Sequence, residues 1–179
     1  MANSELYEEL EGVIFDRDLE AIEKLMKSGA DLNEAYDDED EPYTLLSLAE
    51  DGDDLSFADG LVRLGASPDK TADFRIQVDG DDALCVCLHM GYMISAQALI
   101  ERNLVVDHEY HGSTALHHAC GQIDHHGPRV VEIVRKLLEK GADPNRKDGE
   151  NRTAIGIAEG AVELYDTDEA REVVDLLRR

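Results

Sequence analysis

Apolar residues recur along this chain in pairs of short segments, each with the spacing of an amphipathic helix. The first segments of the early pairs lie at 10–14, 45–49 and 84–87. The second segments lie at 19–26, 55–62 and 94–100. Polar or charged residues separate the segments, and Glu8, Thr44 and Asp82 each open a first segment. Thr and Asp favour the N-cap position, so the pattern predicts a series of helix pairs.

A residue suited to a left-handed conformation ends the second helix of each pair: Gly29, Gly65, Asn103 and Gly141. Successive steps between them are 36, 38 and 38 residues. A fixed step of this length indicates an array of structural repeats, in which each helix pair buries its apolar face against its neighbours.

The motifs TALHHA, EIVRKLLEKGADPN and DGENRTAIGIA, all within 114–158, carry a family resemblance. They resemble the ankyrin repeat and its T-P-L-H-x-A signature, with Ala115 and Ala154 in place of the usual proline and His117 at the signature histidine. The resemblance implies an all-α fold, an ankyrin-type repeat solenoid of about five helix pairs with short β-turn or hairpin fingers. It implies one domain over 1–179, with units at roughly 6–30, 43–66, 81–104, 113–142 and 152–179. It also implies structural roles for His117, Gly29, Gly65 and Gly141.

Several connections are longer than the 12 residues that separate Gly141 from Thr153. The first finger contains the acidic run DDEDE at 37–41, and the second contains FRIQVDGD at 74–81, which predicts a hairpin turning at Asp79-Gly80. The segments 121–129 and 160–169 are expected to be stretched loops between helices. Insertions of this kind are often where repeat proteins bind partners.

Charge narrows the class of partner. The formal net charge is −24, and residues 1–60 alone contain 20 acidic residues against 3 basic ones. Such a field repels nucleic acid and anionic membranes and attracts basic protein surfaces, although acidity that serves solubility alone is the simpler alternative. Cys85, Cys87 and Cys120 form no disulfide-like spacing, and the first residues lack a signal-peptide pattern. We therefore expect a cytoplasmic protein.

Three arrangements suggest chemistry, and each has a simpler explanation. Cys120 lies one helical turn beyond His117, but no orienting group or oxyanion site accompanies them. A histidine enrichment suggests a metal site, although neighbouring histidines in a loop are poor chelators; its members are His108, His111, His118, Asp124, His125 and His126. The acidic run lacks the ligand order of a calcium-binding loop. We therefore predict no enzyme activity, no cofactor and no metal.

The leading functional hypothesis is a protein–protein interaction module, an acidic inhibitor or immunity-type protein that masks a basic surface of a partner such as a nuclease-like toxin. The resemblance, together with the acidic run of the first finger and its flanking tyrosines, places contacts in the fingers and first helices: Tyr36, Asp37, Asp38, Glu39, Asp40, Glu41, Tyr43, Asp51, Asp79, Asp81, His89, Met90, Tyr110, His111 and Gln122. Ser113, His118, Glu150 and Arg152 are adjacent candidates. The free protein is expected to be monomeric. The first alternative is a regulatory or stabilising subunit of a cytosolic enzyme. A metal-dependent enzyme is a less favoured alternative.

Overall fold

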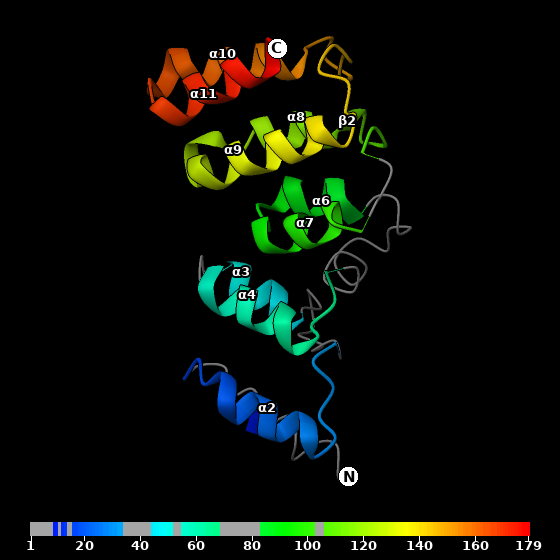
Figure 1. Cartoon of the computed structure of the whole chain (residues 1–179), viewed down its shortest axis with the longest axis vertical. Coiled ribbons are helices and arrows are strands. Elements are labelled where there is room, and N and C mark those ends of the chain that lie inside the picture. The colour runs from blue at the N-terminus through cyan, green and yellow to red at the C-terminus, as the bar shows by residue number, and fades with distance from the viewer. Residues whose placement is uncertain are drawn as a thin grey trace. The chain divides into compact units, whose positions relative to one another are not determined.

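The structure is a computed structural model that describes residues 9–10, 12–13, 16–33, 44–51, 55–68, 83–102 and 106–179. The chain divides into two compact units, Met1–Gln77 and Val78–Arg179, and each is described by itself. Figure 1 labels the helices and strands of both units.

The first unit contains α2 (Leu19–Lys27), α3 (Leu45–Asp51) and α4 (Leu55–Leu64). Helix α2 begins at Asp18, whose carboxylate accepts hydrogen bonds from the backbone N–H groups of Glu20 and Ala21 at 3.1 and 3.0 Å. Helices α2 and α4 pack closely, because a Cβ added at Gly60 would lie 2.4 Å from Leu19 Cδ1. A glycine at that point allows the two helices to approach.

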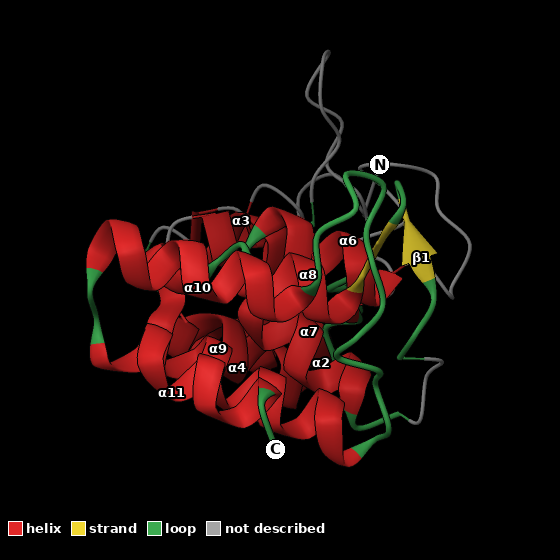
Figure 2. Cartoon of the chain, turned by 90° about the horizontal axis from the view of Figure 1, so that it is seen from above, coloured by secondary structure: helices red, strands yellow, loops and turns green. Residues whose placement is uncertain are grey.

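The second unit contains three helix pairs: α6 (Ala83–Met90) with α7 (Met93–Ile100), α8 (Ala115–Cys120) with α9 (Ile123–Glu139), and α10 (Ala154–Tyr165) with α11 (Asp168–Leu177). Within this unit the first helices α6, α8 and α10 form one layer, and α7, α9 and α11 form the other (Figure 2). The buried side chains between the layers include Leu116, Val134, Leu137, Ala158 and Val173, all fully inaccessible to solvent. The expected stacking of helix pairs is observed in this unit.

Equivalent polar contacts step along the chain in both units. Asn33 lies four residues after Gly29, and its Oδ1 accepts a hydrogen bond from the Ser67 N–H at 2.6 Å. Asp107, four residues after position 103, accepts from the Asp143 N–H at 3.0 Å. Gly29, Gly65 and Gly141 have φ values of 108°, 110° and 92°, a conformation that disfavours any residue with a Cβ.

The finger of the second unit that precedes α8 is a short hairpin. Strand β1 (Glu109–Tyr110) pairs antiparallel with β2 (Ser113–Thr114), and His111 and Gly112 form its two-residue turn. Both turn residues have positive φ, 52° and 77°, as a type I′ turn requires. The hairpin that we predicted at 74–81 lies outside the described residues.

The prediction that 121–129 and 160–169 are stretched loops is wrong. Helix α9 begins at Ile123 and continues through a kink at His126 just before Pro128, while α10 continues to Tyr165. Asp166 and Thr167 alone separate α10 from α11. In 121–129, Ile123 is buried at the start of α9 and Gly127 lies close to the Glu169 side chain, so this segment packs against α11. The added turns of α10 contain good helix formers, among them Ala161, Glu163 and Leu164.

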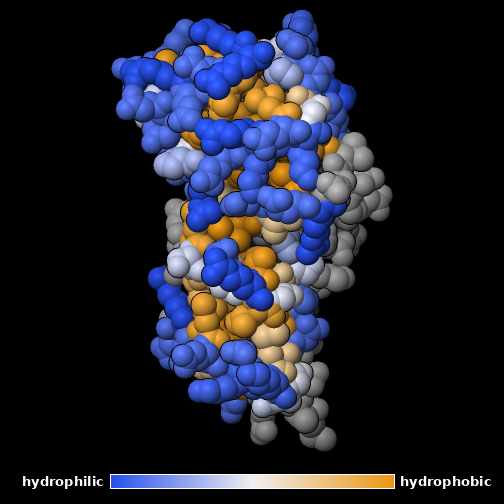
Figure 3. All heavy atoms as spheres, in the orientation of Figure 1, coloured by the Kyte–Doolittle hydropathy of each residue, from blue (hydrophilic) through white to orange (hydrophobic). Residues whose placement is uncertain are grey.

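The face of the second unit drawn in Figure 3 is mainly hydrophilic, with apolar side chains visible between rows of charged ones. This is the surface of amphipathic helices whose apolar stripes face inward. In the part of the chain that the structure describes, no helix combines the length and apolar character needed to cross a membrane.

Candidate functional site

The finger hairpin and the first helices of the second unit surround an open groove of about 470 Å³. Helix α6 contributes His89, and α8 contributes His118 with Gln122 just beyond its end. The hairpin contributes His111 and Ser113, and the next repeat contributes Arg152 and Ile157. We call this the histidine groove. Its polar and aromatic side chains stand on packed helices and on a short hairpin, so they present a preorganised surface.

Among the histidines that line the groove, His89 and His111 are exposed, His117 is buried, and His118 is half-buried. Its Nε2–H donates a hydrogen bond to the Tyr110 carbonyl at 3.3 Å, and its ring meets the His89 ring edge to face, with centroids 5.3 Å apart and planes 77° apart. Burial lowers the pKa of His118 to about 4; the Tyr110 carbonyl opposes this shift, and His89, His117 and His111 add to it. His118 is therefore neutral at physiological pH.

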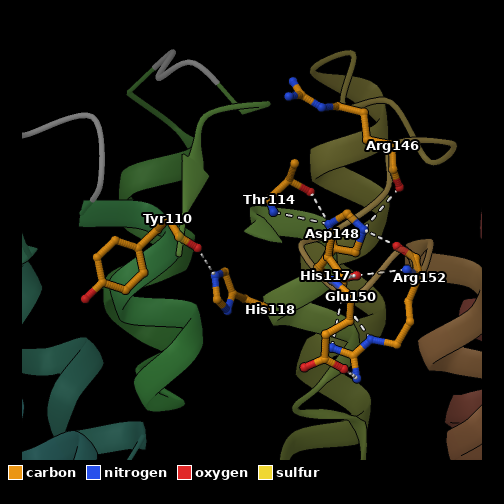
Figure 4. Close-up of polar contacts among 8 residues, drawn as sticks. All are labelled: Tyr110, Thr114, His117, His118, Arg146, Asp148, Glu150 and Arg152. Atoms are coloured by element: carbon orange, nitrogen blue, oxygen red, sulfur yellow. Dashed lines mark hydrogen bonds and ion pairs between the residues drawn. The ribbon is translucent and has the colours of Figure 1, made fainter. Parts of the chain in front are cut away.

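His117 points the opposite way, into the fingers (Figure 4). Its Nδ1 accepts from the Thr114 N–H at 3.2 Å and lies 2.8 Å from the Thr114 hydroxyl. Because Nδ1 accepts, the proton of the neutral ring is on Nε2, which lies 3.1 and 3.2 Å from the carbonyls of Arg146 and Arg152. His117 thus joins the start of α8 to the finger of the following repeat, and its side chain is not available to a partner.

Asp148 organises that following finger. Its side chain is 1 % exposed and accepts hydrogen bonds from the N–H groups of Glu150 and Arg152 at 2.9 and 2.8 Å, and from Arg152 Nε at 2.9 Å. Burial favours the neutral acid, but these donors and the Arg152 charge outweigh it, so the pKa of Asp148 is below its ordinary value. The Gly149 N–H also donates to the Gly112 carbonyl at 2.9 Å, which links the two fingers.

Arg152 connects this finger to the groove. Its guanidinium contacts Asp148 at 2.8 Å and Glu150 at 2.9 Å, and Figure 4 shows the three side chains together. The two carboxylates fix the position of the Arg152 side chain at the wall of the histidine groove. They also neutralise its charge, so the groove does not present a free cation there.

The structure brings together some of the residues that we predicted to contact a partner. His89, His111 and Gln122 line the histidine groove, and the Gln122 side-chain amide donates to the His89 carbonyl at 2.9 Å. The Tyr110 ring lies 4.2 Å from that of His111 and 6.3 Å from that of His118, centroid to centroid. Met90 is half-buried in α6 and is not part of the groove lining.

The acidic half of the predicted site lies outside the described residues. This set comprises Tyr36, Asp37, Asp38, Glu39, Asp40, Glu41, Tyr43, Asp79 and Asp81. Asp51 is the last residue of α3, with its side chain not described. These contacts stay predictions. Ile157 was not identified from the sequence, because it looks like an ordinary apolar position of a helix. The signal was the helical spacing of Ile157, Ala161 and Leu164, which indicates that α10 extends beyond the signature motif and presents these residues on one face.

The residues considered for metal binding or nucleophilic chemistry are not assembled for either. Among the described residues, no group of three or more His, Cys, Asp or Glu side chains converges on a possible metal position. Cys120 is buried, and that burial raises the pKa of its thiol to about 12, so it is protonated at physiological pH. The ring nitrogens of His117 are engaged by Thr114 and by the backbone of the following finger.

Comparisons with known proteins agree with this geometry. A family model for ankyrin repeats in three copies matches residues 45–148. The chain is 29 % identical over 141 residues to alpha-latrocrustotoxin-Lt1a of Latrodectus tredecimguttatus, an alignment that covers 78 % of this chain and 9 % of that protein. The chain thus spans about a tenth of the length of that relative. A crystal structure of an ankyrin repeat domain from Acinetobacter baumannii AYE is similar with a TM-score of 0.57 and 24 % identity, over 94 % of this chain and 79 % of that one.

Proposed function

Because the chain belongs to the ankyrin repeat family, we propose that it is a protein-interaction module that masks a basic surface of a partner protein, in the manner of an inhibitor. Ankyrin repeats mediate binding to other proteins, and their domains are generally not enzymes. What we propose beyond the family's general role is that this chain masks its partner and that the masked surface is basic.

The histidine groove is the observation that supports binding of a partner protein. It is open, it is about 470 Å³ in volume, and its walls belong to three helices and a hairpin, with the His117 and Asp148 networks holding α8 against the following finger. Side chains held in this way lose little conformational freedom when a partner binds. The lining residues His89, His111 and Gln122 offer hydrogen-bonding groups and aromatic faces without a reactive centre.

The charge distribution supports a basic partner. The net charge is −24, and the first third of the chain carries 20 of its 41 acidic residues. A field of this sign accelerates association with a positively charged protein and lowers the affinity for anionic ones. A protein that binds nucleic acid needs a basic groove, so a nuclease-like toxin is one partner of the proposed class. Such an interaction would take place in the cytoplasm.

Association kinetics test this proposal. The partner is first recovered by co-purification from the native cell, and its on-rate is then measured by surface plasmon resonance at low and high salt. We expect the on-rate to fall by about tenfold or more at high salt, because screening removes the steering. An on-rate that does not change with salt would contradict the basic-partner part and leave the interaction module intact.

A second candidate function is a regulatory or stabilising subunit of a cytosolic enzyme, with acidity serving solubility. One observation favours it: the described residues that line the histidine groove include no Asp or Glu. Recognition there can proceed without charge attraction. Charge reversal at 37–41 separates the two functions, because it should abolish binding to a basic partner and leave groove-based binding largely unchanged.

A further inference from the structure

An apolar hollow of about 320 Å³ lies next to the histidine groove, between the start of α9 and one face of α10. Its walls are Ile123, Ile157 and Ala161 with the backbone of Gly156 and Gly160, and Leu164 and Tyr165 stand at its edge. Gly121, Arg152 and Ile157 line both cavities, so the hollow is continuous with the histidine groove. We call it the α10 hollow.

The edge of the α10 hollow exposes apolar surface to water. Leu164 is 76 % exposed and Tyr165 is 51 % exposed, and they are the large hydrophobic residues that stand out as exposed among the described residues. Both lie in the last turn of α10, a helix of 12 residues where α6 has 8 and α8 has 6. The additional turns of α10 therefore lengthen one wall of the cavity and place an unburied Leu-Tyr pair at its edge. Adjacent exposed apolar residues beside a cavity are typical of protein-binding sites.

The glycines in the floor of the hollow are not required by the packing of this chain. A Cβ at Gly160 would meet nothing within 4 Å, and a Cβ at Gly156 would meet only the Thr153 hydroxyl at 3.6 Å, an ordinary contact. Neither glycine has positive φ, and both lie within α10, where alanine is the better helix former. Their effect in the folded chain is to leave the floor open to a side chain from outside.

The charges around the hollow favour a basic neighbour. Asp124 is part of the wall, and Arg152 is neutralised by Asp148 and Glu150, which together leave an excess of negative charge there. Asp166 follows Tyr165 directly and shares Arg171 with Asp168, so this end of α10 carries one more carboxylate than guanidinium group, and the helix dipole there also attracts cations. A purely apolar segment would leave this excess of negative charge unbalanced, whereas Lys or Arg beside the apolar anchor would balance it.

We propose that the α10 hollow receives one bulky aliphatic or aromatic side chain from a partner protein, in a segment that carries Lys or Arg next to that side chain. This inference rests on the proposed function, which it deepens by naming the anchor and its position. Ile157 and Ala161 contact the inserted side chain, Leu164 and Tyr165 cover it from the edge, and Asp124 and Asp166 bind the flanking cations.

Three matched peptides test the inference against the full chain labelled with ¹⁵N. The first has a central phenylalanine between two pairs of lysines, the second replaces the phenylalanine with alanine, and the third replaces the lysines with glutamates. We expect the first peptide to shift the amide resonances of Gly156, Gly160 and Leu164. We expect the second and third peptides to bind at least about tenfold more weakly, because each lacks one half of the recognition.

Two variants and a control locate the binding. Gly160→Ala fills part of the hollow and improves helix propensity, so it should raise the melting temperature and weaken binding of the phenylalanine peptide. The pair Leu164→Ser and Tyr165→Ser should weaken binding without loss of cooperative unfolding, because both residues are exposed. Gly12→Ala is the matched control, since its Cβ also meets nothing within 4 Å and it lies in the other unit. It should leave binding unchanged.

The outcomes separate this inference from the proposed function. Equal binding of the phenylalanine and alanine peptides, or shifts confined to amides away from α10, would overturn the anchor site and leave the masking of a basic partner standing. Equal binding of the lysine and glutamate peptides would overturn the basic character of the segment. If no peptide binds and Gly160→Ala captures the native partner as well as the parent chain does, the α10 hollow is not a binding site, although the chain still functions as an interaction module.

Discussion

Acidification should destabilise the second unit through His118. In the folded chain the pKa of this histidine is about 4, because its ring is buried between α6, α8 and the finger hairpin. In the unfolded chain its pKa is about 6.5. The unfolded state therefore binds a proton that the folded state does not, and stability falls as the pH drops from about 6.5 towards about 4.

The magnitude follows from the two pKa values. The full difference corresponds to about 3 kcal/mol once the pH is below both, and about 2 kcal/mol of it is lost between about pH 7 and about pH 5. Most single domains are stable by only about 5–15 kcal/mol, so a loss of this size is readily measured. At neutral pH almost none of this stability is lost, because His118 is neutral in both the folded and the unfolded state.

The assay is urea unfolding followed by circular dichroism across this pH range, for the parent chain and for His118→Gln. Glutamine can still donate to the Tyr110 carbonyl but cannot take up the proton. Between about pH 7 and about pH 5, the free energy of unfolding of the variant should therefore fall by about 2 kcal/mol less than that of the parent chain. His125→Gln is the control, because the side chain of His125 is 70 % exposed. The free energy of unfolding of His125→Gln should vary with pH as it does in the parent chain.

Nuclear magnetic resonance titration of the His118 ring gives the pKa directly. A midpoint near 6.5 in the folded protein would contradict this prediction, since it would mean that burial does not disfavour the charged ring. Parallel stability curves for the parent chain and His118→Gln would refute it equally.

Three further predictions concern the architecture. His117→Ala should lower the free energy of unfolding by about 1–3 kcal/mol in urea, because the Thr114 N–H and the carbonyls of the following finger lose a buried partner; a loss as small as that of an exposed histidine substitution would contradict this role. Gly141→Ala should lower stability by about 1 kcal/mol or more, since φ is 92° there, and a neutral effect would show that the turn relaxes without cost. Cys120 should resist alkylation by iodoacetamide in the native protein and react on unfolding, because its thiol pKa is about 12; rapid native modification, detected by mass spectrometry, would show that the thiol is accessible.

Much of the fold could be predicted from local sequence signals. The apolar spacing within 45–49 and 55–62 predicts α3 and α4, and the steps between Gly29, Gly65 and Gly141 predict the repeat. These signals are strong because a helix and its caps are determined by residues within about four positions of one another. The same local reasoning failed at 121–129 and 160–169, where glycines and charged residues suggested loops. Packing of Gly127 against α11 supports the helical turns in the first segment, and helix formers such as Ala161 and Leu164 extend α10 in the second.

The helix pairs, their repeat length, the family and the acidic character of the chain could all be derived from the order of its residues. Three features became visible in three dimensions alone: His89 and His118 share one groove, His117 faces the fingers, and α10 borders a hollow with Leu164 at its edge. His89 and His118 are far apart along the chain and meet because consecutive repeats stack. A binding surface in a repeat protein is assembled between units, whereas the sequence pattern within each unit specifies its own helices.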